Sequence, residues 1–295
     1  MSAAEIRGSL AACGALAAVG SLVAASDVIE RYPIASGQAV RYALAAAVLL
    51  ALARGRLPRL TRREALFLVS LAATGLVLFN AFVIAGVREG DPGTVGVIVG
   101  CVPVVLALAG PAVEGRPIRP AVVAAASVVA LGAAGVEYVG GAITPLGVIA
   151  ALGALACEAA FSLLAVPVLR RLGPLAVAAY ACLFAVPLLV PWSLVGEGLP
   201  PLPSVTEAAA FGYLALIVTA GGFLLWYYAL GRLGVERAGL FSGVLPVAAL
   251  ACSAAIGAAE ITIGRLAAVA VVALGVTLGM LGARPAERSA ATSVR

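Results

Sequence analysis

The sequence predicts an all-α membrane protein of about ten transmembrane helices, arranged as two inverted five-helix repeats. Of its 295 residues, 63% are hydrophobic and 11% are charged, whereas a soluble domain carries roughly 45–50% apolar and about 25% charged residues. The mean hydropathy is +1.13, so a water-soluble globule is excluded. The apolar residues form runs long enough to cross a bilayer, and several motifs recur at a nearly constant offset.

The transmembrane helices are separated by clusters of charged residues, glycines and prolines, such as Arg88-Glu89-Gly90-Asp91-Pro92. A helix needs about 20 apolar residues to cross a hydrocarbon core of about 30 Å. The separation at 113–120 is short, and the number of spans is open by one there. We predict spans at 9–26, 34–53, 65–86, 94–113, 120–137, 146–169, 174–195, 208–230, 238–257 and 264–282.

The arginines indicate the orientation, because cytoplasmic loops retain basic residues. If the N-terminus is cytoplasmic, 15 of the 19 arginines lie in cytoplasmic segments. Only Arg31, Arg88 and Arg265 lie outside, and Arg41 lies within a span. We therefore expect a multi-pass protein of the cell inner (plasma) membrane with both termini in the cytoplasm.

The first apolar run has a second interpretation. Arg7, the run that follows it and Ala24-Ala25-Ser26 also resemble a cleaved signal peptide. Cleavage would remove one span and leave the two halves of the chain unequal, so the internal repeat favours a retained helix.

Several function classes are excluded by residue types that are missing. Every basic residue is arginine and almost all lie between apolar runs, so the net charge of +5 reflects topology and no nucleic-acid partner is expected. Without lysine there is no phosphate-binding Walker motif. Histidine is absent and the cysteines are scattered singly, so no metal and no cofactor are expected. The five cysteines are Cys13, Cys101, Cys157, Cys182 and Cys252.

An internal repeat relates the two halves of the chain. Matching positions occur in three consecutive spans, at offsets of 143 or 144: Phe79 with Phe223, Pro103 with Pro246, and Leu131-Gly132 with Leu274-Gly275. Five spans are an odd number, so the second copy enters the membrane from the opposite side, as in many secondary transporters. We expect repeats at 1–137 and 138–283 and a short cytoplasmic tail at 284–295.

The ordered motifs of the chain resemble the EamA family of the drug/metabolite transporter (DMT) superfamily over about 9–282. The residues that carry the resemblance are Arg41-Tyr42, Pro103…Glu114, Val244-Leu245-Pro246…Glu260…Gly264 and the glycine-rich Leu274–Gly279. The resemblance implies a ten-helix transporter of small polar or amphipathic solutes such as amino acids, often working in efflux. Two departures are the Pro103–Glu114 spacing, one turn shorter than Pro246–Glu260, and Glu158, which replaces an aromatic or small residue.

Two ionisable residues, Arg41 and Glu158, are predicted inside spans. A charge at the middle of a membrane costs at least about 2.5–3.5 kcal/mol, so it normally faces a cavity or a partner. One interpretation is that Arg41 binds a substrate carboxylate or phosphate, while Glu158 binds an amine or carries a coupling proton. The alternatives are a static Arg41–Glu158 pair, or a protonated Glu158 held by neighbouring helices.

Asn80 and Trp226 are candidate substrate-binding residues at repeat-related positions in spans three and eight. An amide with aromatic walls suits an amphipathic solute, because ligand pockets are mostly apolar with a few placed polar groups. Tyr227 and Tyr228 follow Trp226, and the alternative is that all three belong to an interfacial aromatic belt.

Pro103 and Pro246 are candidate hinge or gating residues. Each interrupts the backbone hydrogen bonds of its span and could supply a kink along the pathway. Prolines also occur as static kinks in membrane helices, which is the alternative.

Together these features predict a secondary transporter that moves a small metabolite by alternating access around a central cavity. An uncoupled channel-like facilitator, an intramembrane enzyme and a non-transporting scaffold are the rivals. An enzyme is disfavoured because the chain has no histidine and a single acidic residue is predicted at mid-membrane. The substrate, the direction, proton coupling and the oligomeric state stay open; the lipid bilayer is the expected surrounding.

Overall fold

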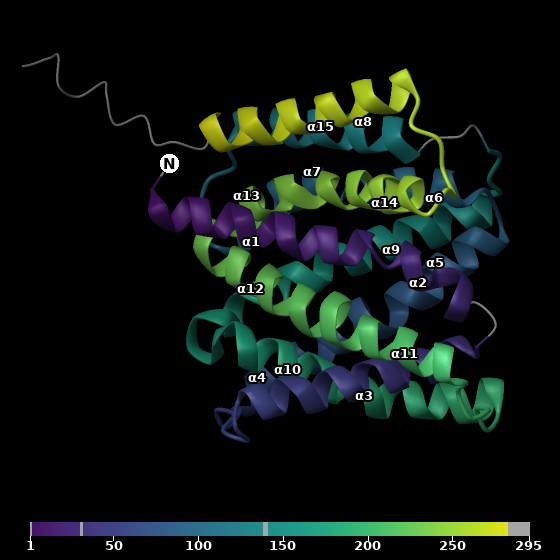
Figure 1. Ribbon diagram of the computed structural model, residues 1–295. Helices are drawn as coiled ribbons and strands as arrows, with labels where there is room; N and C mark the ends of the chain where they lie inside the picture. The colour runs from purple at the N-terminus through teal and green to yellow at the C-terminus, as the bar shows by residue number, and fades with distance from the viewer. Residues whose placement is uncertain (1, 30–31, 138–140, 283–295) are drawn as a thin grey trace, which may run out of the picture.

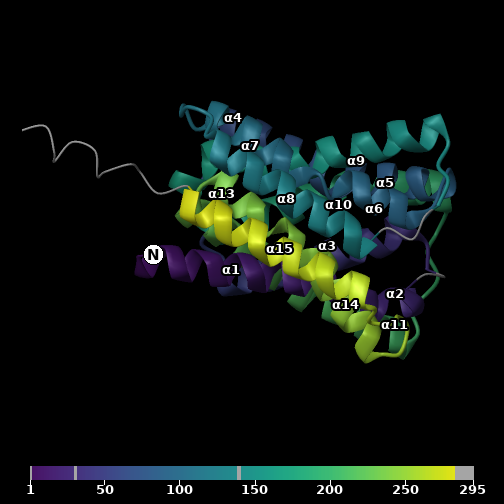
Figure 2. The same cartoon turned by 90° about the horizontal axis from the view of Figure 1, so that it is seen from above.

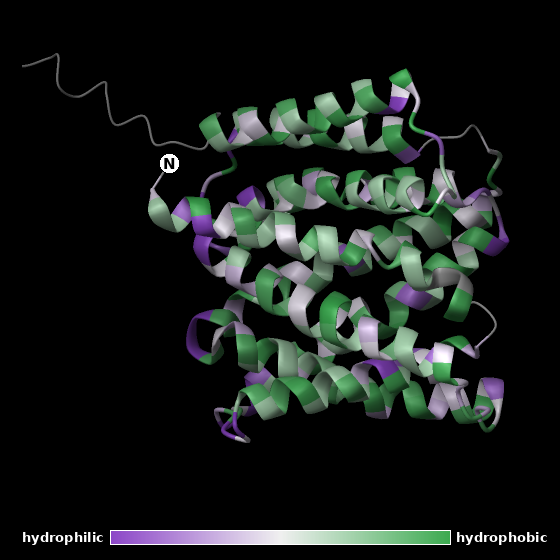
Figure 3. Ribbon diagram, in the orientation of Figure 1, coloured by the Kyte–Doolittle hydropathy of each residue, from purple (hydrophilic) through white to green (hydrophobic). Residues whose placement is uncertain are grey.

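A computed structural model describes residues 2–29, 32–137 and 141–282. Within these residues ten helices are long and apolar enough to cross a membrane, which confirms the predicted number of spans. Apolar residues cover the middle of the bundle, while hydrophilic residues gather in the connections at its two ends (Figure 3). The predicted tail at 284–295 and Arg31 lie outside the described residues.

The first five spans are mostly broken into shorter helical pieces. Their elements are α1 (Ala3–Gly20) with α2 (Val23–Ile29), α3 (Ile34–Leu52), α4 (Arg62–Leu71) with the π-helical η1 (Ala72–Leu78) and α5 (Phe79–Arg88), α6 (Pro92–Val99) with α7 (Val102–Val113), and α8 (Pro120–Glu137).

The last five spans repeat this plan. Their elements are α9 (Pro145–Leu163), α10 (Val166–Trp192) with the π-helical η2 (Ser193–Glu197), α11 (Val205–Tyr213) with the π-helical η3 (Leu214–Gly221) and α12 (Gly222–Leu233), α13 (Val235–Gly239) with the 3-10 helix η4 (Leu240–Gly243) and α14 (Val244–Ala255), and α15 (Ile263–Gly282). The predicted end of the span at 146–169 is wrong, because α9 ends at Leu163. The segment from Val166 turns sharply at Gly173, whose φ of 77° favours glycine.

The two ends of the bundle are defined by the chain termini. The N-terminus and the last residues of α15 lie at the same end, called here the N-terminal end; the other is the distal end (Figures 1 and 2). Helix α1 starts at the N-terminal end and α9 starts at the distal end (Figure 1). The two five-span repeats therefore run in opposite directions.

Helices start where the sequence offers a capping side chain. The side chains of Ser2, Thr61 and Ser204 each accept a hydrogen bond from the backbone N–H three residues on, and the glutamate at that position accepts one from the backbone N–H of the cap residue. At the distal end the Asp91 and Thr144 side chains cap α6 and α9 in the same way, each just before a proline in the first turn. These local signals set where the segments begin.

Helices α8 and α15 pack side by side and show the internal symmetry directly (Figure 1). A methyl group added to Gly132 would lie 2.7 Å from the Val272 backbone nitrogen, and one added to Gly275 would lie 2.8 Å from that of Val129. The offset of 143 relates Gly132 to Gly275 and Val129 to Val272. Each glycine therefore makes the contact of its counterpart, and small residues bring the two backbones together.

The π-helical segments of spans three and eight are also related by the repeat. An offset of 143 carries Ala72–Leu78 onto residues 215–221, within η3. π-Helical turns inside α-helices occur frequently at functional sites. Gly75 of η1 lines a central cavity of the bundle, and Thr219 of η3 accepts a hydrogen bond from Arg41, which lines the same cavity.

Candidate functional site in a two-chamber cavity

The centre of the bundle contains two adjoining chambers, with volumes of about 260 and 210 Å³. The larger is lined by α1, α2, α3, η1, α5, α9, α12 and α14, and the smaller by α1, α5, α6, α7, α8, α9, η4 and α14. Five residues line both: Leu16, Val19, Phe79, Glu158 and Leu245. Both repeats therefore contribute to one continuous lining.

Arg41, predicted within a span, lies on α3 and lines the larger chamber. Its side chain is held by Thr219 of η3, to which Nε donates a hydrogen bond of 2.6 Å, and by the Tyr42 ring at 5.5 Å. The residue is 8% exposed. No carboxylate pairs with Arg41 among the residues that the structure describes. The guanidinium therefore keeps donors for a ligand.

Asn80 lies beside Arg41 in the same chamber. Its Nδ2 donates to the Leu76 carbonyl at 2.8 Å, and its Oδ1 accepts from Gln38 Nε2 at 3.4 Å. Gln38 also accepts from Arg41 Nη1 at 3.5 Å. Gln38 was not predicted from the sequence; it lies one turn before Arg41 on α3, and this spacing is the signal that points to it.

Glu158 lies near the middle of α9, about 20 Å along the helix from Pro145. It lines both chambers and has no hydrogen bond or ion pair in the described part of the chain. The expected alternative of a static Arg41–Glu158 pair is absent from the described residues. The two residues face the larger chamber separately.

Trp226 on α12 also lines the larger chamber, and its Nε1 donates to Ser162 Oγ at 3.1 Å. Its neighbour Tyr227 is fully buried against Phe161, with ring centroids 5.4 Å apart. Tyr228 instead contacts Arg232, nearer the N-terminal end. An interfacial aromatic belt describes the environment of Tyr228 alone, because the other two side chains point into the bundle.

Pro246 borders the smaller chamber, whereas Pro103 is buried and lines neither chamber. Neither proline breaks the interior of a helix. Pro103 is the second residue of α7, after a break at Gly100 and Cys101, and Pro246 is the third residue of α14, after η4. In the first turn the missing N–H has no partner to lose, so the breaks precede the prolines.

Glu137 is a chamber residue that was not predicted from the sequence. It ends α8 and lines the smaller chamber together with Glu158. Its carboxylate lies against Gly96 of α6, where an added methyl group would collide with Oε2. Glu137 was the last residue of a predicted span, so it was interpreted as a charge at the membrane interface. The signal was its repeat counterpart, Met280, which is apolar.

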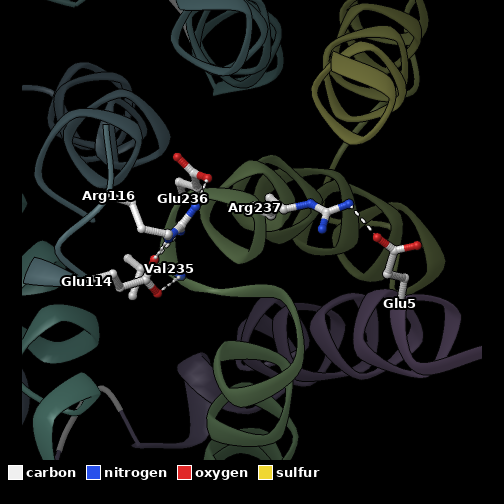
Figure 4. Close-up of polar contacts among 6 residues, drawn as sticks. All are labelled: Glu5, Glu114, Arg116, Val235, Glu236 and Arg237. Carbon is white, nitrogen blue, oxygen red and sulfur yellow. Dashed lines mark hydrogen bonds and ion pairs between the residues drawn. The ribbon is translucent and has the colours of Figure 1, made fainter. Parts of the chain in front are cut away.

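A cluster of charged side chains joins the two repeats at the N-terminal end (Figure 4). Arg116 forms ion pairs with Glu114 and with Glu236, and Glu114 Oε1 accepts from the Val235 backbone N–H at 3.0 Å. Burial opposes the charge of Arg116, but hydrogen bonds to Glu114 and Glu236 outweigh it and raise its pKa. A second pair, Arg237 with Glu5 at 2.8 Å, ties α13 to α1.

The cavity approaches the surface at the distal end. A small pocket of about 60 Å³ next to the larger chamber shares Ile29, Gln38 and Arg41 with it. A separate cavity of about 650 Å³ lies at the N-terminal end, where it is lined by Glu114, Arg170 and other residues. It shares no lining residue with the chambers.

The fold and the cavity agree with the comparisons to known proteins. The model of the EamA-like transporter family matches residues 7–138 and 145–281, one match for each repeat. The chain belongs to the EamA-like transporter family. This family is part of the DMT superfamily, so the chain is a multi-pass membrane protein and a transporter by descent. The family points to transport rather than to catalysis.

Two other proteins are similar to this chain. The uncharacterized transporter YetK of Bacillus subtilis (strain 168) is 26% identical over 240 residues, which cover 78% of this chain and 73% of YetK. A protein of known crystal structure has a TM-score of 0.79 over 94% of this chain and 98% of its own, at 22% identity. That likeness shows the fold alone.

Proposed function

We propose that this EamA-family protein is a secondary transporter that moves a small metabolite, such as an amino acid or a related amphipathic solute, by alternating access. One observation carries the proposal: Arg41 and Glu158 face the same cavity from opposite repeats and form no pair within the described residues. Ionisable residues inside membrane helices typically mark substrate or ion pathways, because their burial costs several kcal/mol.

The proposed binding mode assigns one role to each side chain. Arg41 donates to a carboxylate or phosphate of the solute, as its guanidinium is oriented by Thr219 and carries unused donors. Trp226 and Phe223 cover the apolar part, and Asn80 supplies an amide. Glu158 binds an amine or carries a coupling proton.

The arrangement of the two ends supports a state that is accessible from the distal end. The small distal pocket adjoins the larger chamber at Arg41, while Arg116 and Glu236 hold the repeats together at the N-terminal end. With the N-terminus cytoplasmic, as the arginine distribution predicts, this state faces the outside of the plasma membrane. Family resemblance favours export as the net direction.

We propose that the repeats at 1–137 and 138–283 rock against each other. The helix breaks before Pro103 and Pro246 are the candidate hinges, since loop and element-terminal residues absorb the backbone changes of domain closure. Breaking the Arg116–Glu236 contact would open the cavity toward the N-terminal end of the bundle.

The test is solute flux in proteoliposomes that contain the purified protein, with and without a pH gradient. A transporter predicts saturable uptake that unlabelled solute on the other side accelerates; uptake without this acceleration indicates a channel-like facilitator. Glu158→Gln should abolish the response to the gradient if Glu158 carries the proton. Glu260→Gln is the matched control, because Glu260 is exposed and lines neither chamber. Unchanged gradient-driven uptake in Glu158→Gln would remove the proton-carrier role.

A further inference from the structure

The smaller chamber contains two carboxyl groups that pair with no other side chain among the described residues. Glu158 lies where the two chambers meet, and Glu137 lines the smaller chamber alone. Neither carboxylate has a hydrogen bond or an ion pair in the described part of the chain. Their oxygens are not among the fully buried atoms that lack a partner, so they are accessible from the cavity. With both carboxyl groups ionised, Glu137, Glu158 and Arg41 sum to one net negative charge.

The fold itself does not require a carboxylate at position 137. The offset of 143 that relates α8 to α15 places Met280 at the equivalent position, and Met280 is buried there. Glu137 is also the last residue of α8, at the negative end of the helix dipole, where a carboxylate is disfavoured. Gly96 leaves room for its side chain. The helix dipole disfavours a carboxylate at position 137, yet Gly96 leaves space for one. We therefore expect Glu137 to serve a ligand.

The wall between the two carboxylates is apolar. Apart from Glu137, Glu158 and Ser242, the smaller chamber is lined by aliphatic residues, glycines, Phe79 and Pro246. The chamber thus presents two acidic groups at different depths of an apolar space, with Glu137 at the end of α8 and Glu158 near the middle of α9. Its chemical complement is a cationic nitrogen at each end of an aliphatic chain, since buried charges need an opposite charge.

We propose that the cavity binds an aliphatic solute carrying two protonated amines, with one amine at Glu158 and the other at Glu137. This inference rests on the proposed function for the identity of the site and adds its substrate class. Glu137 is the specificity-determining residue that separates such a solute from neutral amino acids. Arg41, in the larger chamber, accommodates a carboxylate when the solute is a basic amino acid.

The experiment measures binding to the purified full-length protein by calorimetry at pH 7, with L-lysine, cadaverine and L-norleucine. Lysine carries two amines and a carboxylate, cadaverine lacks the carboxylate, and norleucine lacks the second amine. Lysine or cadaverine should bind at least about tenfold more tightly than norleucine, the effect of one charged hydrogen bond. A preference for lysine over cadaverine identifies a basic amino acid as the ligand; equal binding identifies a diamine.

Three variants test whether the second amine binds at Glu137. Glu137→Gln should weaken binding of the preferred amine about tenfold and leave norleucine unchanged. Gly96→Ala keeps the charge but displaces the carboxylate, and should weaken the same ligand. Glu260→Gln removes an exposed carboxylate at the same end of the bundle and should change nothing.

Three results would overturn the substrate class. They are norleucine binding as tightly as lysine and cadaverine, no binding of either lysine or cadaverine, and Glu137→Gln binding these two ligands like the wild type. Exchange in proteoliposomes keeps the two proposals distinct. Saturable exchange of norleucine or other neutral solutes without diamine binding would retain the transporter and reject the diamine. Diamine binding without exchange of any solute would retain the site and reject transport.

Discussion

Arg116 and Glu236 connect the first repeat to the second, with Nη1 of the arginine 2.8 Å from Oε1 of the glutamate. The Glu236 side chain is fully buried, whereas Arg116 is 34% exposed. The other oxygen, Oε2, has no hydrogen bond among the described residues. The buried carboxylate therefore depends on one arginine and couples the two repeats at the N-terminal end.

Removing the arginine should destabilise this end of the protein. Arg116→Met leaves the Glu236 charge buried without a partner, and we expect a loss of about 1–3 kcal/mol, discounted for the solvent exposure of the arginine. The double variant Arg116→Met/Glu236→Met should recover most of that loss, since well-packed apolar groups often replace a buried pair at no cost. Thermal unfolding in detergent measures both, with Arg88→Met as the exposed control. A double variant less stable than the single one would contradict this explanation.

The reciprocal glycine contacts between α8 and α15 should tolerate no methyl group. Gly132→Ala and Gly275→Ala each place a carbon within 2.8 Å of a backbone nitrogen, so the helices must separate. We expect each change to cost about 1–3 kcal/mol through overpacking. Gly212→Ala is the matched control, because a methyl group there meets nothing within 4 Å. Equal melting temperatures for the three variants would show that the close approach is not needed.

Arg41 should determine the recognition of carboxylated solutes. Arg41→Gln removes the charge and should reduce transport of such a solute by about tenfold or more, the loss of one charge-assisted hydrogen bond. Thr219→Val should give a smaller loss, because it releases Nε but keeps the guanidinium in the chamber. Initial rates in proteoliposomes measure both, with Arg88→Gln as a control outside the cavity. Wild-type transport rates in Arg41→Gln would show that Arg41 does not recognise the solute.

Trp226 should report ligand binding by its fluorescence. The chain has two tryptophans, so Trp192→Phe leaves Trp226 as the single emitter in the larger chamber. A bound solute excludes water beside the indole and should shift or quench its emission in a saturable way. The converse variant, Trp226→Phe, retains Trp192 and should show no such response. A response in the converse variant alone would place the ligand elsewhere.

The membrane spans were predictable because each depends on local composition. The bilayer requires a minimum apolar length, and charged or turn-forming residues interrupt these runs at every connection. The end of α9 at Leu163 was missed, because hydrophobicity continues through 163–169. The turn at Gly173 lies in the connection predicted between the spans at 146–169 and 174–195. The repeat was visible because packing of α8 on α15 demands the same small residues twice.

The residues that line the cavity could be anticipated in part. Arg41, Asn80, Glu158 and Trp226 do line one chamber, and each was noticed because a polar or aromatic group within a span is unusual. Glu137 was missed because its depth depends on the direction of its side chain. The prolines were assigned to helix interiors, but hydrogen bonding around them shows that each belongs to the first turn of a new segment.

The ten membrane crossings and the two related halves follow from the amino-acid sequence, since both properties depend on runs of residues and on their repetition. Which charges meet and which stay apart depends instead on the tertiary structure. Arg116 and Glu236 come together across the repeats, while Arg41 and Glu158 share a chamber without pairing. Pairing depends on distances between helices remote in the chain, and no local pattern encodes those distances.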